Sequence, residues 1–185
     1  MEEQPVYNEL ETAENEKPMW KHAVTYGLYF AVAYILISVV VYITGAMNSK
    51  PVTWITNIVM IVAIILIQIH YRKTLGGFIS YGQSVGIAVL SMLMAAVPIA
   101  IYTYALYKFI DPALLDQIKM MTEEQMVNRG MPEEQLDAAL AMSSKFQTPG
   151  IIAFSQFFNL PLTGVIIGLI TSIFIKKQSP DKIFE

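Results

Sequence analysis

Long runs without charged residues dominate the chain. Asp, Glu, Lys and Arg are absent from four stretches, residues 22–49, 51–71, 74–107 and 146–175. A bilayer hydrocarbon core of about 30 Å requires about 20 helical residues, and each stretch is that long. Buried helices of a soluble protein normally keep a polar face, which these stretches lack. The pattern therefore predicts an all-α polytopic membrane protein with four transmembrane helices, over about residues 23–45, 52–70, 84–110 and 150–175.

The sizeable extramembrane region in this pattern lies between the third and fourth helices, at residues 111–149. Asp111 is placed to cap a helix at its N-terminus, and Thr122 with Gln125 matches a capping box. Gly130 suits the position just after the end of a helix. We therefore expect a helical insert of two or three short amphipathic helices.

Composition agrees with a membrane protein. Apolar residues make up 55% of the chain and charged residues 15%, whereas soluble domains carry roughly 25% charged residues. Around a membrane domain at residues 22–177, the pattern predicts a flexible acidic tail at 1–21 and a C-terminal tail at 178–185. The absence of cysteine excludes disulfides and thiolate chemistry. The net charge of −3 gives no indication of nucleic-acid binding.

Lys and Arg residues near the helix ends predict an orientation, because cytoplasmic loops are enriched in them. With both termini in the cytoplasm, the inner side carries Lys17, Lys21, Arg72, Lys73, Lys176, Lys177 and Lys182. The outer side then carries Lys50, Lys108, Lys119, Arg129 and Lys145. Seven basic residues against five favour this orientation, with the insert outside.

Few side chains in the predicted helices offer chemistry. The two histidines, His22 and His70, fall at the predicted inner edge of the membrane. They are either a pair that binds a metal or titrates near neutral pH, or interfacial side chains; the lack of an accompanying ligand pattern favours the second. No nucleophile–base or phosphate-loop motif occurs. The sequence therefore predicts a protein that is not an enzyme, with no catalytic residue, metal site or cofactor.

Methionine is abundant in the insert, at positions 120, 121, 126, 131 and 142. Thioethers bind Cu(I), but they also fill irregular apolar contacts and adaptable binding surfaces. Because the spacing follows no regular metal repeat, packing or contact with a partner is the favoured interpretation.

Small residues on the fourth helix predict close helix packing. Gly164, Gly168 and Ser172 lie on one helical face, where another backbone can approach. This face packs inside the bundle or forms a dimer, and the first is favoured. Pro98 and Pro161 lie inside the third and fourth helices, where each is expected to kink its helix because it removes a backbone hydrogen bond.

The loops resemble a known family. The segments YRKTLGGFISYGQ, YKFIDP, MTEEQMVNRGMPEEQLDAALAM and TPG are similar to the bacterial membrane-protein family catalogued as domain of unknown function 4199. The resemblance covers roughly residues 18–177. It implies a four-helix membrane protein of Gram-negative bacteria with a helical insert between the third and fourth helices. It supplies no activity, cofactor or catalytic residue.

Together these observations predict a non-enzymatic accessory or interaction subunit of the bacterial inner membrane, with the insert as its contact surface. The alternative is a small-solute or lipid transporter or channel, whose path would follow the kinked helices. The expected partners are the lipid bilayer and either another protein or a second copy of the chain, and not nucleic acid.

Overall fold

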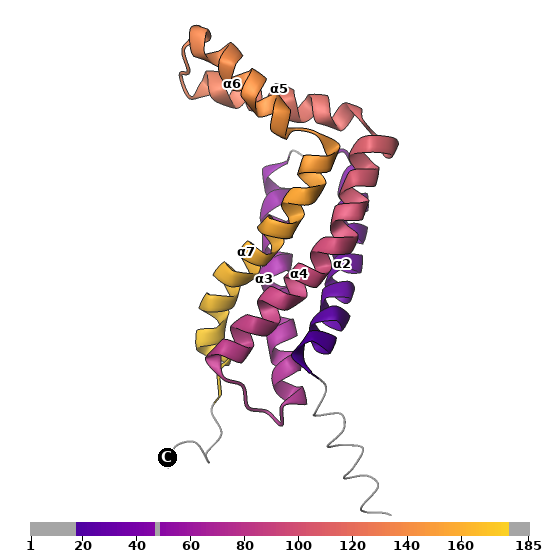
Figure 1. The fold of residues 1–185 in the computed structure, drawn as a ribbon, viewed down its shortest axis with the longest axis vertical. Coiled ribbons are helices and arrows are strands. Elements are labelled where there is room, and N and C mark those ends of the chain that lie inside the picture. Colours follow the sequence, from indigo (N-terminus) through magenta and orange to yellow (C-terminus); the bar gives the residue numbers. More distant parts are fainter. Residues whose placement is uncertain (1–17, 47–48, 178–185) are drawn as a thin grey trace, which may run out of the picture. The chain divides into compact units, whose positions relative to one another are not determined.

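The computed structural model describes residues 18–46 and 49–177. In chain order (Figure 1) its elements are α2 (Met19–Ile43), α3 (Lys50–Thr74), α4 (Tyr81–Ala105), a π-helical turn (Leu106–Ile110), α5 (Ala113–Asn128), α6 (Glu133–Phe146) and α7 (Pro149–Ile175). No strand occurs among these residues, and the predicted all-α class with a helical insert is confirmed. The acidic tail predicted at residues 1–21 lies outside the described residues except for 18–21, and the tail predicted at 178–185 lies wholly outside them.

Four of the helices are long and apolar enough to cross a membrane. They comprise 25 residues in α2, 25 in α3, 30 in α4 with its π-helical turn, and 27 in α7. The charge-free stretches of the sequence lie within or around these helices, and together they indicate a multi-pass membrane protein.

The chain divides into two compact units. One unit contains α2, α3, α4 as far as Ala96, and α7 from Asn159 onward. The other is Val97–Phe158, which holds the end of α4, the π-helical turn, α5, α6 and the start of α7. Each unit is described separately below.

Within the first unit, α4 is the central helix. Half of its most apolar stretch is buried, compared with 33% in α7 and 17% in each of α2 and α3. Its buried residues include Ile87, Ala88, Met92 and Ala95. Because small and large side chains alternate along this helix, the backbones of neighbouring helices can approach it closely.

The turn after α3 closes the first unit at one end. Gly76 and Gly77 both have positive φ, 70° and 89°, which glycine adopts without steric cost. Their amides donate to Lys73 O and Arg72 O, at 3.2 and 3.0 Å, and so end α3. Just beyond, Ile79 and Lys177 exchange two backbone hydrogen bonds of 2.9 and 3.0 Å, which join this turn to the residues that follow α7.

In the second unit, α5 and α6 lie side by side as a helical hairpin (Figure 1). Gly130, with φ 77°, terminates α5, and the Met131 amide donates to Met126 O at 3.2 Å, as the sequence predicts for this glycine. At the far end of α6, Gln147 Nε2 donates to Thr122 Oγ1 at 3.0 Å and ties the two helices together.

The capping box predicted at Thr122 and Gln125 is wrong. Thr122 lies in the interior of α5, where its hydroxyl donates to Ile118 O at 2.8 Å. The start of α5 is instead marked by Asp111, whose carboxylate accepts a hydrogen bond of 3.1 Å from the Ala113 amide. A Thr-x-x-Gln spacing also occurs inside helices. The pair Asp111-Pro112 is the stronger signal for the start of α5.

Both predicted kink residues lie inside helices, Pro98 in α4 and Pro161 in α7. Each helix continues through its proline. Because proline has no amide hydrogen, the carbonyl groups of Met94 and Phe157 lose their usual helical donors.

Candidate functional site

The most distinctive polar group of the first unit is the side chain of Gln68. It lies on the face of α3 that also buries Ile64, Ile67 and Tyr71, a spacing that puts all of them on one side of the helix. The Gln68 side chain is completely buried, with 0% exposure. An amide buried in an apolar bundle is costly unless it is hydrogen-bonded.

Both ends of the Gln68 amide have partners on other helices. Nε2 donates to the Ser84 carbonyl oxygen at 3.2 Å and to Ser172 Oγ at 3.0 Å. Oε1 lies 2.7 Å from Thr171 Oγ1, which donates to it. The same Thr171 hydroxyl lies 2.8 Å from Ile167 O, so its single proton is shared between an intrahelical and an interhelical acceptor.

This Gln68 cluster, which consists of Gln68, Ser84, Thr171 and Ser172, connects α3 with α4 and α7. Amides and hydroxyls do not titrate in the physiological range, and the hydrogen bonds of the cluster hold three helices in register. Among the described residues, the hydroxyl oxygens of Ser84 and Ser91 are buried without a hydrogen-bond partner.

Two further contacts fix the same end of the unit. Arg72 Nη1 donates to Ile175 O at 3.2 Å, at the C-terminus of α7, where a cation complements the helix dipole. Tyr81 Oη donates to Leu169 O at 3.1 Å. Sequence analysis placed Arg72 among the basic residues of the inner side and did not predict the contacts that Gln68 and Arg72 make across the bundle.

The predicted packing residues of α7 face α4. A Cβ atom at Gly164 would lie 3.0 Å from Met92 Cγ, and one at Gly168 would lie 3.2 Å from Ala88 Cβ. Ser172, on the same face, is the buried acceptor for Gln68. An even closer approach occurs on α2, where a Cβ atom at Gly27 would lie 2.5 Å from Ser91 O.

The two histidines contact one aromatic cluster. His22 lies against Tyr26 and Tyr71, with ring centroids 5.9 and 5.3 Å apart, and His70 lies 5.7 Å from Tyr26. Within residues 18–46 and 49–177 no group of three or more His, Asp or Glu side chains is arranged to hold a metal ion. Each imidazole packs against aromatic rings.

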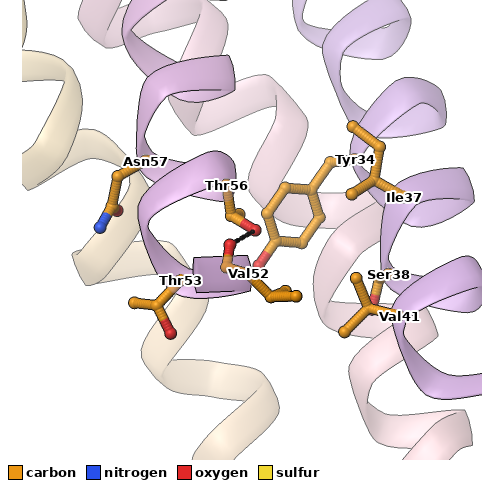
Figure 2. A pocket seen from close by; sticks show the side chains of 8 residues that line it. All are labelled: Tyr34, Ile37, Ser38, Val41, Val52, Thr53, Thr56 and Asn57. Atoms are coloured by element: carbon orange, nitrogen blue, oxygen red, sulfur yellow. Dashed lines mark hydrogen bonds between the residues drawn. The ribbon is translucent and has the colours of Figure 1, made fainter. Parts of the chain in front are cut away.

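Two grooves lie between α2 and α3. Figure 2 shows the first, which has a volume of about 240 Å³. The Tyr34 ring is directed from α2 toward Thr56, whose hydroxyl donates to Val52 O at 2.9 Å, whereas the Asn57 amide points away from α2. The residues that line this polar groove are Tyr34, Ile37, Ser38, Val41, Val52, Thr53, Thr56 and Asn57.

The second groove is nearly apolar, with a volume of about 290 Å³. It is formed closer to the start of α2 and the end of α3, and its polar lining side chains are Tyr26, Tyr29 and His70. The residues of this apolar groove are Tyr26, Tyr29, Phe30, Ala63, Leu66, Ile67 and His70. Sequence analysis did not identify either groove, because helices that are apolar on every side give no signal of which side faces a neighbour.

A comparison with protein families agrees with this architecture. A family model described as "Protein of unknown function (DUF4199)" matches residues 25–177, which include α3, α4, the hairpin, α7 and all of α2 except its first six residues. The match confirms the resemblance seen in the loop segments. No curated protein and no solved structure matches the chain.

Proposed function

The chain belongs to this DUF4199 family of proteins of unknown function, and from its surface we propose that it is a non-enzymatic accessory or interaction subunit of the bacterial inner membrane. The contact surface is the α5–α6 hairpin. A single observation carries this proposal: the hairpin exposes large apolar side chains although it is the most charged part of the described chain.

The exposed apolar residues come from both helices of the hairpin. Met120 and Val127 on α5 are 69% and 53% exposed, and Met142 and Phe146 on α6 are 65% and 58% exposed. Methionine side chains adapt to irregular partners, and aromatic residues and methionine are enriched in protein interfaces. The predicted partner role of the insert methionines therefore rests on the two that are most exposed.

The interior of the first unit favours a subunit over a catalyst. The polar side chains that meet between α3, α4 and α7 are the amide and hydroxyls of the Gln68 cluster. Enzymatic acid–base chemistry uses a group with a pKa near the working pH, and these groups do not titrate there.

A small-solute or lipid transporter or channel remains the second candidate, and the polar groove of Figure 2 favours it. Its lining runs from Tyr34 to Val41 on α2 and from Val52 to Asn57 on α3. Helix segments of that length rise only about 10 Å, whereas the hydrocarbon core is about 30 Å thick. A path across the membrane would need further polar lining, so the subunit role is the stronger proposal.

We expect a photoreactive residue on the hairpin to capture a protein. A benzoylphenylalanine at Met142, in the full chain in its native membrane, should give one discrete adduct whose mass spectrum identifies a single partner. The matched control is the same residue at Asp137, an exposed position on α6 that lies about 140° around the helix from Met142.

The pattern of adducts decides between the proposals. An adduct at Met142 that is absent at Asp137 supports the contact surface. An adduct with a second copy of the chain assigns the surface to a homo-oligomer and removes the accessory role. Adducts with lipid alone, or equal diffuse labelling at both positions, contradict the proposal.

A further inference from the structure

Basic residues converge at one end of the first unit. Lys21 lies at the start of α2, Lys73 at the end of α3, and Lys177 just after α7. The contact of His22 with Tyr71 joins the first two positions, and the Ile79–Lys177 backbone pair joins the third to the turn after α3. Arg72 and Lys176 lie at this same end.

No acidic residue of the unit's helices balances these cations. The sequence contains no Asp or Glu from residue 18 to residue 110 or from residue 149 to residue 177. Lys21 and Lys73 are both exposed. Cationic side chains at a membrane edge are attracted to anionic lipid head groups, by about 1 kcal/mol each, or about fivefold in affinity.

The apolar groove runs toward the end of the unit that carries these cations. His70 lines the groove on α3, and Lys73 follows it by three residues, which is just under one turn. On α2, Tyr26 lines the groove and His22, stacked on it, precedes it by about one turn, next to Lys21. A ligand in the groove therefore has an apolar environment along the helices and positive charge at one end.

From this arrangement we propose that the apolar groove between α2 and α3 holds one anionic phospholipid. An acyl chain occupies the groove beside Phe30, Ala63 and Ile67, and the head-group phosphate lies between Lys21 and Lys73. The occupant is a lipid because the groove opens along helices of membrane-spanning length, and it is anionic because both cations lack an acidic neighbour on those helices. This site is independent of the partner surface proposed on the hairpin.

The test is retention of lipid by the full-length protein. The protein, released from nanodiscs that contain equal amounts of palmitoyl-oleoyl phosphatidylglycerol and phosphatidylcholine, is analysed by native mass spectrometry. We expect one phosphatidylglycerol to be retained in preference to phosphatidylcholine. The double variant Lys21→Gln/Lys73→Gln should lower this retention by about 25-fold, as expected for two cations near a charged head group.

Matched controls distinguish a local binding site from a general effect of the protein's positive charge on lipid retention. The double variant Lys50→Gln/Lys108→Gln removes the same charge at positions outside the basic end, and it should leave retention unchanged. Ala63→Phe, which fills the groove, should abolish retention, whereas Val62→Phe, at the neighbouring lipid-facing position, should not. The lysine variants alter exposed side chains and keep the test decisive if Ala63→Phe does not fold.

Four results would overturn the proposal. Equal retention of the two lipids, or equal loss in both double lysine variants, would show that no local anionic site exists. Retention that Ala63→Phe leaves unchanged would remove the groove from the site. Zero-length carbodiimide cross-links from Lys21 and Lys73 to the acidic residues between 2 and 16, with no lipid retained, would show that the chain itself neutralises this end.

Discussion

Gly27→Leu should be the most destabilising of the glycine substitutions in the first unit. A Cβ atom at Gly27 would lie 2.5 Å from the Ser91 carbonyl oxygen and 2.9 Å from Met94 Cβ, so α2 and α4 would have to separate. Overpacking of this kind costs about 1–3 kcal/mol or more. The midpoint of thermal unfolding of the detergent-purified protein, followed by circular dichroism, should fall by roughly 5–10 °C.

The other glycines provide a graded control. At Gly168 the nearest atom to an added Cβ is Ala88 Cβ at 3.2 Å, so Gly168→Leu should lower the midpoint by less than Gly27→Leu. At Gly82 an added Cβ meets nothing within 4 Å, and Gly82→Leu should leave the midpoint unchanged or raise it slightly, because leucine favours helix. A midpoint for Gly27→Leu equal to that of Gly82→Leu would show that α2 does not pack closely on α4.

Removal of the Gln68 amide should have the second large effect. Gln68→Met keeps a side chain of similar length but loses the hydrogen bonds to Ser84 O, Ser172 Oγ and Thr171 Oγ1. Interhelical hydrogen bonds in membranes are worth about 0.6 kcal/mol on average, so three of them predict a loss of about 2 kcal/mol. Unfolding of the protein by SDS, added to mild-detergent micelles, should show this as a lower transition midpoint.

A matched substitution isolates the cluster. Gln156→Met makes the same change at a half-buried position of α7 and should leave the SDS midpoint near that of the unmodified protein. In the double variant, Thr171→Val should recover part of the midpoint lost in Gln68→Met. Neither position then keeps a polar group whose partner at the other position has been removed. If Gln68→Met, Gln156→Met and Thr171→Val lowered the SDS midpoint equally and additively, the cluster would not act as a unit.

The fold could be predicted from the sequence because membrane insertion depends on the length and charge of each segment. A charge-free run such as residues 51–71 has few alternatives to a spanning helix, and Gly130 marked the break in the hairpin because its positive φ is a backbone requirement. The capping-box prediction at Thr122 was wrong because this spacing indicates a cap only at the start of a helix. Here the helix begins just after Asp111.

The contacts between helices were less predictable. The sequence analysis singled out Gly164 and Gly168, yet Gly27 makes the closer approach, because closeness depends on which atoms of α4 lie opposite. Gln68 lies near the end of an apolar run, and its burial depends on the Thr171–Ser172 pair more than a hundred residues away. Neither fact is encoded in the local pattern of α2 or α3.

We propose that all four apolar helices cross the inner membrane, with both termini in the cytoplasm and the hairpin outside. The chain has no cysteine, so single cysteines can be introduced at Ser144 in α6 and at Ser80 between α3 and α4, both of which are exposed. Spheroplasts are treated with a membrane-impermeant maleimide before and after permeabilisation. The account predicts labelling of Ser144→Cys in intact spheroplasts and of Ser80→Cys only after permeabilisation. Labelling of both positions from the same side would contradict a four-span topology, and the reverse pattern would invert the orientation.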